Sequence, residues 1–197
     1  MGFKVKDHYF EKAKKDNYLA RSIYKLEEIN EKFKVLKKND FVLDLGYHPG
    51  SWMQYTSKVI GPDGSAIGID LKPVNKKLVS IKNIVLFEKD VFDIDDASTL
   101  GATHKFDTIL SDMAPNTTGI KSVDQARSLA LVEKVIELLP AFLKVNGNFV
   151  IKIFDSSEAQ QFIKTIQSEF KTLKKLKPKS TRSVSKEFFV IGKGYGA

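Results

Sequence analysis

The chain has 197 residues, of which 42% are hydrophobic and 11% aromatic, a composition that excludes an intrinsically disordered protein and suits one compact domain. It has no cysteine, which excludes disulfides, thiolate zinc sites and iron–sulfur clusters, and its three histidines are too scattered for a metal cluster. No apolar run reaches the roughly 18–20 residues that a membrane helix needs, and no signal peptide is recognisable. We therefore expect a cytoplasmic protein without a metal or a membrane association.

The formal net charge is +8, and its distribution is uneven. Residues 1–40 carry a net charge of +4, residues 41–163 carry −3, and residues 164–197 carry +7. Two basic ends around an acidic middle favour binding of a polyanion such as a nucleic acid, because each neutralised phosphate releases counterions. The alternative is a solvated, lysine-rich surface without a partner.

Short apolar runs alternate with amphipathic stretches along the chain. The first 40 residues carry a basic amphipathic helix at about 20–33. Strands are then expected at 41–45, 66–70, 84–88, 106–111 and 148–154, and helices at 51–60, 123–143 and 156–170. The apolar stripe of the long helix is expected at Ala126, Leu129, Ala130, Val132, Val135, Ile136 and Leu139. Such alternation predicts a parallel sheet with helices on both faces.

The C-terminal segment breaks this alternation. Residues 170–176 and 188–191 read as two strands joined by a polar loop that is too short for a helix, so an antiparallel pair is expected at the edge of the sheet. The predicted fold is α/β, with a seven-stranded, mostly parallel sheet and a C-terminal antiparallel strand. This is the layout of Rossmann-like class I methyltransferases. We expect one domain, with 1–40 as a basic helical extension and 41–197 as the core.

A glycine-containing loop follows the first strand. Gly46 and Gly50 allow a tight turn and a close approach to a ligand, and Trp52 begins the next helix. The G-x-x-x-G spacing is neither the dinucleotide fingerprint nor a P-loop. Asp70 ends the second strand, where it can accept from ribose hydroxyls, and Asp90 follows the third, where it can accept from an adenine amino group. The combination predicts an adenosine-bearing cofactor without phosphates, such as S-adenosylmethionine; the alternative is a plain turn with solvated acids.

Two charged residues lie at the next two strands. Asp112 directly follows the fourth strand, and Lys152 lies inside the apolar fifth strand. A lysine in such a strand is costly unless it is paired or functional. Because these strands are neighbours in this sheet type, the two side chains are expected to meet at its carboxyl end. The alternative is a structural ion pair or a lysine that reaches solvent from a strand end.

At these residues the chain closely resembles the FtsJ family of RNA 2′-O-ribose methyltransferases, over nearly its whole length. The matching segments are Arg21-x-x-Tyr24-Lys25-Leu26, Asp44-Leu45-Gly46-x-x-Pro49-Gly50-x-Trp52, Ser111-Asp112-Met113-Ala114-Pro115-Asn116, Lys152, and Lys177-Pro178-x-x-Thr181-Arg182-x-x-Ser185-x-Glu187. Their joint order and spacing make the resemblance specific.

The resemblance implies reactive residues at Lys25, Asp112, Lys152 and Glu187. It implies that Lys152 contacts the ribose 2′-oxygen, as a base if neutral or as an orienting cation if charged. Cofactor contacts are implied at Gly50, Trp52, Asp70, Asp90 and Asp112, beside Gly46. We expect RNA to be bound by basic residues on two flanks of the site: Lys12, Lys15 and Arg21 on one, and Lys175, Lys177 and Arg182 on the other.

The implied reaction is methyl transfer from S-adenosylmethionine to a ribose, a uridine of the A-loop, in large-subunit ribosomal RNA, by a monomer that acts on ribosomal RNA or the large ribosomal subunit. Two alternatives stay open. One is the same reaction on transfer RNA, a messenger cap or another RNA. The other is a non-catalytic RNA-binding assembly factor, against which the intact set of four reactive residues argues.

Overall fold

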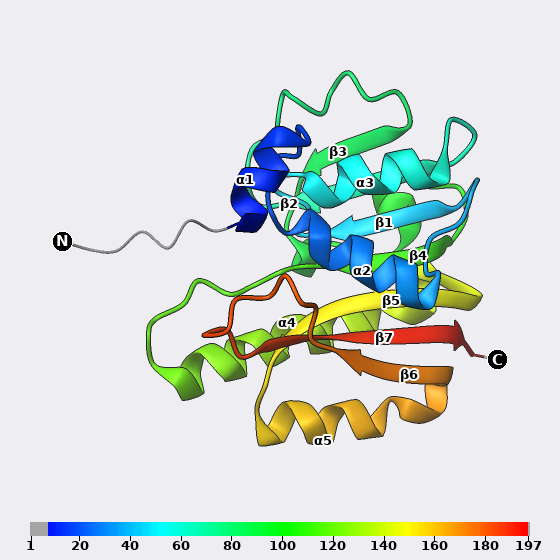
Figure 1. The fold of residues 1–197 in the computed structure, drawn as a ribbon. Coiled ribbons are helices and arrows are strands. Elements are labelled where there is room, and N and C mark those ends of the chain that lie inside the picture. The colour runs from blue at the N-terminus through cyan, green and yellow to red at the C-terminus, as the bar shows by residue number, and fades with distance from the viewer. Residues whose placement is uncertain (1–7, 197) are drawn as a thin grey trace.

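The computed structural model describes residues 8–196 (Figure 1). Its helices are α1 (His8–Lys15), α2 (Ile23–Phe33), α3 (Ser51–Ile60), α4 (Lys121–Phe142) and α5 (Ser157–Thr165). Its strands are β1 (Phe41–Leu45), β2 (Ser65–Asp70), β3 (Ile84–Glu88), β4 (Phe106–Ser111), β5 (Leu143–Phe154), β6 (Phe170–Leu176) and β7 (Glu187–Tyr195). Three short 3₁₀ helices, η1 (Val91–Asp93), η2 (Ala97–Leu100) and η3 (Gln167–Glu169), complete the elements of the described residues.

The seven strands form one sheet in the order β3-β2-β1-β4-β5-β7-β6. The first five strands pair in parallel, while β7 runs antiparallel to both of its neighbours, β5 and β6. The order reverses between β1 and β4, and in open α/β sheets ligands bind in the crevice beyond the carboxyl ends of strands at such a point. The predicted fold class is therefore confirmed, including the antiparallel C-terminal strand.

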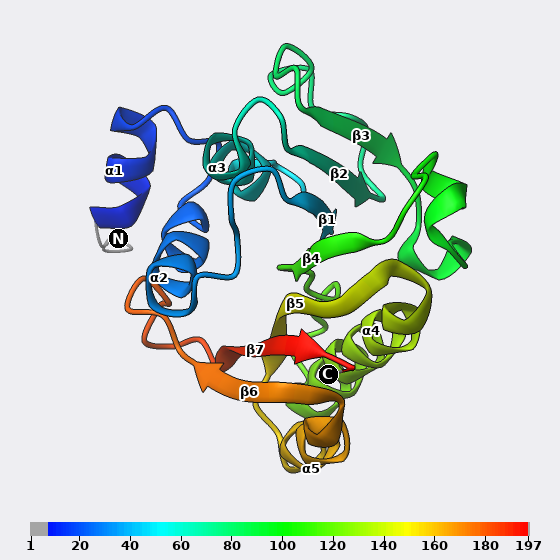
Figure 2. The ribbon, with the colours of Figure 1, turned by 90° about the vertical axis from the view of Figure 1, so that its right-hand side faces the viewer.

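Helices cover both faces of the sheet, as Figure 2 shows, with α1, α2 and α3 on one side and α4 on the other. Each face has its own buried cluster. Leu26 of α2 and Met53 of α3 belong to one cluster, and Leu139 of α4 belongs to the other. Because side chains alternate along a strand, the neighbours Phe149 and Val150 of β5 are buried in different clusters.

Element boundaries differ from the expected ones at several places. Helix α1 was not expected; it is only eight residues long and is stabilised by tertiary contact, since Ala13 is buried against Ile23 and Tyr24. The helix expected at 156–170 ends at Thr165, and the short helix η3 begins at Gln167. Strand β5 begins at residue 143 instead of 148, directly after α4, and β7 extends over nine residues.

The buried face of α4 also differs from the predicted apolar stripe. Ala126 and Ala130 are exposed, whereas Asp124 and Ser128 are buried beside Val132. The polar pair is buried because it bonds backbone groups: Asp124 accepts from the amides of residues 118 and 119, and Ser128 accepts from the amide of residue 154. Within residues 8–196, no helix is long and apolar enough to cross a membrane.

Candidate active site

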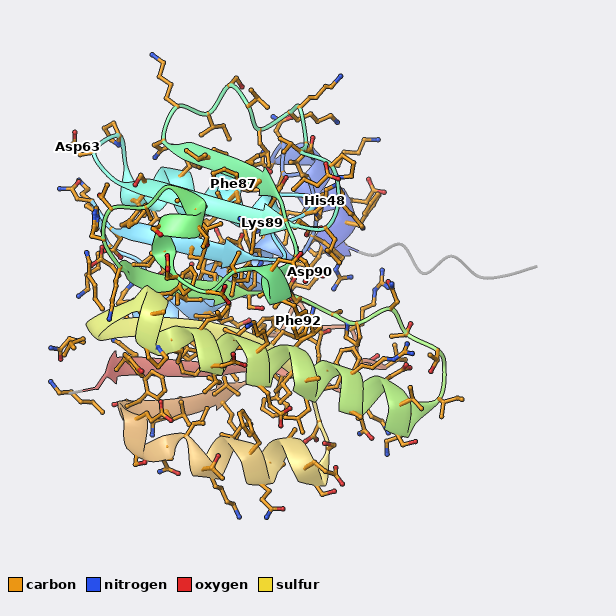
Figure 3. All side chains as sticks on the ribbon, turned by 180° about the vertical axis from the view of Figure 1, so that it is seen from behind. His48, Asp63, Phe87, Lys89, Asp90 and Phe92 are labelled. Carbon is orange, nitrogen blue, oxygen red and sulfur yellow. The ribbon has the colours of Figure 1, made fainter. Side chains whose placement is uncertain are left out.

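The parallel strands β1, β2, β4 and β5 end at one edge of the sheet. In Figure 1 this edge lies on the left, together with α1, the start of α4 and the loop between β6 and β7. In Figure 3, which shows the molecule from behind, His48, Asp90 and Phe92 lie toward this edge and Asp63 lies at the opposite one. Most of the predicted catalytic and cofactor-binding residues lie on the strand ends and loops of this edge, while Lys25 lies on α2 and Trp52 on α3.

Lys152 lies inside β5, and its side chain is only 8% exposed. Its Nζ lies 2.9 Å from Asp112 Oδ1 and donates to the backbone oxygen of Asp112 at 2.5 Å. The register of the two strands, in which Ser111 pairs with Ile151, brings these residues together. A buried ammonium is tolerated here because the carboxylate and the carbonyl replace the water it loses.

Lys25 and Glu187 form a second pair beside the first. Lys25 lies in the first turn of α2, and its Nζ donates to Glu187 Oε1 at 2.5 Å. The same Nζ lies 4.0 Å from Asp112 Oδ1. Glu187 is brought to this edge because it opens β7 opposite Phe154, the last residue of β5.

Glu187, Lys25, Asp112 and Lys152 thus form a chain of alternating charges, which we call the tetrad. All four side chains are at least four-fifths buried. Each ammonium has three N–H groups, and the contacts with the carboxylates and the carbonyl do not use all of them. The arrangement can therefore hold a substrate oxygen at a fixed position and share its proton.

The loop between β1 and α3 lies beside the tetrad. Gly50 has φ +111°, a left-handed conformation that side chains disfavour, and a Cβ there would lie 2.2 Å from Leu78. Trp52 is buried, and its Nε1 donates to the carbonyl of Ser22 at 2.8 Å. The hydroxyls of Ser22 and Ser51 lie 2.9 Å apart. The loop is therefore attached to the segment just before α2, which carries Lys25.

Tyr47, inside this loop, belongs to the buried cluster under α2 and α3. Its ring lies over Gly68 of β2, where a Cβ would come within 3.0 Å of the ring. Because Gly68 has no side chain, the Tyr47 ring can pack against β2 in the core.

Asp70 and Asp90 lie at the ends of β2 and β3. Asp70 accepts from the backbone amides of His48 and Lys72 at 3.0 and 2.9 Å, and Asp90 caps η1 by accepting from the amide of Phe92 at 3.0 Å. These bonds orient both carboxylates and leave lone pairs for a ligand. Leu71, directly after Asp70, is 69% exposed, and Phe92, two residues after Asp90, is 53% exposed; Figure 3 shows Phe92 beside Asp90.

Asp44 is a residue of this site that the sequence reasoning missed. It is 1% exposed, and neither of its carboxylate oxygens has a hydrogen-bond partner among the described residues. Burial, and then the charges of Asp112 and Asp70, raise the pKa of Asp44 well above its usual value. The signal was present: a charge inside the apolar run of residues 41–45, the argument that singled out Lys152.

The residues at this edge fit a nucleoside-type cofactor that carries a cationic group. A small cavity of about 10 Å³ adjoins Asp44, Gly46, Trp52 and Asp112, room for a group the size of one water molecule. A buried carboxylate without a partner calls for a donor, and an ammonium has about that size. A larger ligand must lie over the loop, where Asp70 and Asp90 offer further acceptors.

The basic residues expected to bind RNA lie in two groups. Lys12 and Lys15 are exposed on α1, and Lys12 Nζ lies 4.2 Å from the centre of the Tyr24 ring. Arg21 donates to the carbonyl of Ser180 in the β6–β7 loop, and the charge of Arg182 in that loop contributes to a lowered pKa of Arg21, after burial. The flanks expected on two sides of the site therefore meet at this loop.

Lys175 and Lys177 form the second group, at the end of β6. Both are exposed; Lys175 bonds Gln160 Oε1, and Lys177 donates to the carbonyl of Ser185 at 2.7 Å.

The chain is similar to known methyltransferases over nearly its whole length. The model of the family described as FtsJ-like methyltransferase matches residues 18–195. Two proteins named "Ribosomal RNA large subunit methyltransferase E" are similar, one from Syntrophobacter fumaroxidans, 44% identical over 98% of this chain and 97% of that protein, and one from Bdellovibrio bacteriovorus, 45% identical over 98% of both. A crystal structure described as a ribosomal RNA methyltransferase from Plasmodium falciparum superposes with a TM-score of 0.76, at 26% identity, over 90% of this chain and 98% of the other. The chain therefore belongs to the FtsJ-like methyltransferase family.

Proposed function

We propose that this methyltransferase transfers the methyl group of S-adenosylmethionine to the 2′-oxygen of a ribose in large-subunit ribosomal RNA. The observation that carries the proposal is the tetrad, which lies at the carboxyl edge of the sheet beside the glycine loop. The names of the relatives support the substrate class, and the basic residues at the same edge suit a polyanion. A uridine of the A-loop is the target that the family resemblance implies.

The cofactor would lie over the loop of residues 46–50. Asp70 is oriented to accept from its ribose hydroxyls and Asp90 from its adenine amino group, with Leu71 and Phe92 as apolar cover. Asp44 and Asp112 offer acceptors for its ammonium group. When bound, the cofactor supplies a methyl group already activated on a sulfonium.

The tetrad would position the ribose hydroxyl and manage its proton. Lys152 donates one hydrogen bond to the backbone oxygen of Asp112 and forms an ion pair with its carboxylate, and since an ammonium has three N–H groups, one can reach the ribose 2′-oxygen. As an ammonium Lys152 orients this oxygen for in-line attack, and as a neutral amine it also accepts the proton that the hydroxyl loses when the O–CH₃ bond forms. Glu187 holds Lys25 beside the same position. Because one chain supplies all four residues, we propose that the enzyme acts as a monomer. We place it in the cytoplasm, where its ribosomal substrate would be found.

The decisive experiment is transfer of labelled methyl from S-adenosylmethionine to large ribosomal subunits isolated without the modification, followed by mapping of the labelled ribose. We expect one labelled 2′-oxygen. Transfer RNA and capped messenger RNA serve as parallel substrates, and label on either of them instead would contradict the ribosomal assignment. Cofactor and RNA binding without any transfer would identify an assembly factor.

Loss of the ion pair between Lys152 and Asp112 should nearly abolish the reaction. Lys152→Ala and Asp112→Ala should each lower kcat by about 10²–10⁴-fold, because positioning and proton transfer are lost together. Circular dichroism and thermal unfolding check that the variants are folded. Asp63→Ala, a carboxylate at the opposite edge of the sheet, should keep full activity. Wild-type turnover by Lys152→Ala would show that the assignment is wrong.

A further inference from the structure

A pocket rich in lysine adjoins the tetrad on the side of β7. It has a volume of about 550 Å³, within the range of about 300–1,000 Å³ that small ligands occupy. Four lysines line it: Lys121 at the start of α4, Lys175 and Lys177 at the end of β6, and Lys186 just before β7. We call this site the lysine pocket.

The charges of the lysine pocket favour an anion. Its two carboxylates are already engaged, because Asp155 Oδ1 accepts from Gln160 at 2.7 Å and Glu187 bonds Lys25. Lys175 and Lys177 are held by bonds to Gln160 and Ser185. Lys121 and Lys186 are exposed, and neither ammonium has a hydrogen bond or ion pair with another residue of the described chain. Two ammonium groups therefore remain to bind a ligand from outside.

The position of the pocket identifies the anion. Glu187 lines the pocket and is also a member of the tetrad, so the pocket begins where the reactive ribose would lie. In an RNA strand the groups nearest to a ribose 2′-oxygen, outside its own nucleoside, are the adjoining phosphodiesters. A strand that places its ribose at the tetrad therefore brings a phosphate to this side.

The neighbouring cavity shows where the anion-binding region ends. A second cavity of about 760 Å³ continues from Lys121 between α4 and α5, and its other charged residues are Glu133, Asp155 and Glu158. Positive charge is therefore concentrated at the end of the groove next to the tetrad. A polyanion is attracted to that end and is repelled farther along.

We propose that the lysine pocket binds the phosphodiester next to the reactive ribose, with Lys121 and Lys186 as the contacting side chains. The proposal rests on the proposed function, because it takes the reactive group to be a ribose of an RNA strand. The contact sets the register of the strand, so that one 2′-oxygen reaches Lys152. It carries no information on base identity, since phosphate contacts position an RNA and do not read its sequence.

The test compares Lys121→Ala, Lys186→Ala and the double variant with Lys38→Ala. Lys38 is an exposed lysine just before β1, at the opposite edge of the sheet, so its variant matches the change in net charge of each single variant. Methyl transfer to unmodified large ribosomal subunits is measured at several salt concentrations. The double variant should raise KM by about tenfold with a smaller change in kcat, and should make the slope of log(kcat/KM) against log salt shallower by about one to two. Lys38→Ala should match the wild type in both.

A second measurement locates the contact without relying on catalysis. Lysine acetylation, read by mass spectrometry, should be suppressed at Lys121 and Lys186 when subunits are bound and unchanged at Lys38. If the double variant behaves like Lys38→Ala while the wild type transfers methyl, the assignment of phosphate binding to the lysine pocket is wrong and the proposed function stands. Protection with an unchanged salt slope would mean contact with a ribosomal protein and would also overturn it. If the wild type transfers no methyl, the proposed function fails, and protection of these lysines by purified ribosomal RNA, free of ribosomal proteins, still decides whether RNA occupies the pocket.

Discussion

At the scale of single residues, two charges buried in apolar strands behave differently. Lys152 in β5 has its counter-charge, Asp112, at 2.9 Å. Asp44 in β1 has no hydrogen-bond partner in the described part of the chain, and it lies near two further carboxylates. The Lys152 ammonium is stabilised by a group of the protein itself. The unpaired Asp44 carboxylate lowers the stability of the folded state, and a bound cation would remove this destabilisation. We therefore interpret Asp44 as a group retained for ligand binding.

Asp44→Asn should stabilise the ligand-free protein. Because folding raises the pKa of Asp44, the proton on this carboxyl stabilises the folded state fully only below the unfolded-state pKa of about 3.9, where the group is protonated in both states. This stabilisation is lost as the pH rises through the folded-state pKa. At pH 7 the substitution should raise the free energy of unfolding by roughly 1–3 kcal/mol, and the gain should shrink toward pH 4. Urea unfolding from pH 4 to 8 measures this, with the exposed Asp63→Asn as control. Parallel pH curves for Asp44→Asn and the wild type would contradict the interpretation.

At the scale of elements, the site depends on how neighbouring segments fit together. The buried face of α4 is partly polar because Asp124 and Ser128 hold the loop after Asp112 and the end of β5. The amides of residues 118 and 119 also lower the pKa of Asp124, which keeps its carboxylate charged. On the other face, the loop of residues 46–50 and β2 fit each other through Tyr47 and Gly68. Both sets of contacts join different elements, and the apolar periodicity of a single helix therefore did not predict them.

Gly68→Ala should destabilise the protein through Tyr47. The added Cβ would lie 3.0 Å from the Tyr47 ring and 2.9 Å from Leu86, at a cost of about 1–3 kcal/mol in the free energy of unfolding. In a Tyr47→Ala background the cost of Gly68→Ala should be clearly smaller, and in a Tyr47→Phe background, which keeps the ring, it should be undiminished. Urea denaturation of the variants provides the values. Additive effects in the Tyr47→Ala background would show that the two residues do not interact in this way.

At the scale of the whole molecule, the N-terminal helices are connected to both ends of the core. The amide of Leu19 donates to Gln54 Oε1 of α3 at 2.9 Å, and Trp52 donates to Ser22. From the C-terminal side, the amide of Lys179 donates to Glu28 Oε2 at 2.7 Å. These bonds place α2, and with it Lys25, between the glycine loop and the β6–β7 loop. We propose that the extension and the core fold as one domain.

A single unfolding transition is therefore expected. Trp52, the only tryptophan, lies where the N-terminal segment meets α3, so its fluorescence reports on that contact, while circular dichroism reports on the whole chain. The two thermal unfolding curves should coincide, as they do for a cooperative domain. A fluorescence change that precedes the loss of secondary structure would show that the extension detaches first.

Local patterns predicted which segments along the chain form strands and which form helices, because an apolar run bounded by turn residues is a local property of the chain. Its own pattern also singled out Asp112 and Lys152, whereas Lys25 and Glu187 entered through the family resemblance. The contact between Lys25 and Glu187 could be seen only in the folded chain, because the two residues are 162 positions apart and their contact depends on the register of β7 against β5. The fold also shows that Asp44 has no hydrogen-bond partner among residues 8–196 and that four lysines from three segments surround one pocket. Charges pair through space, and no local pattern encodes which of them become neighbours.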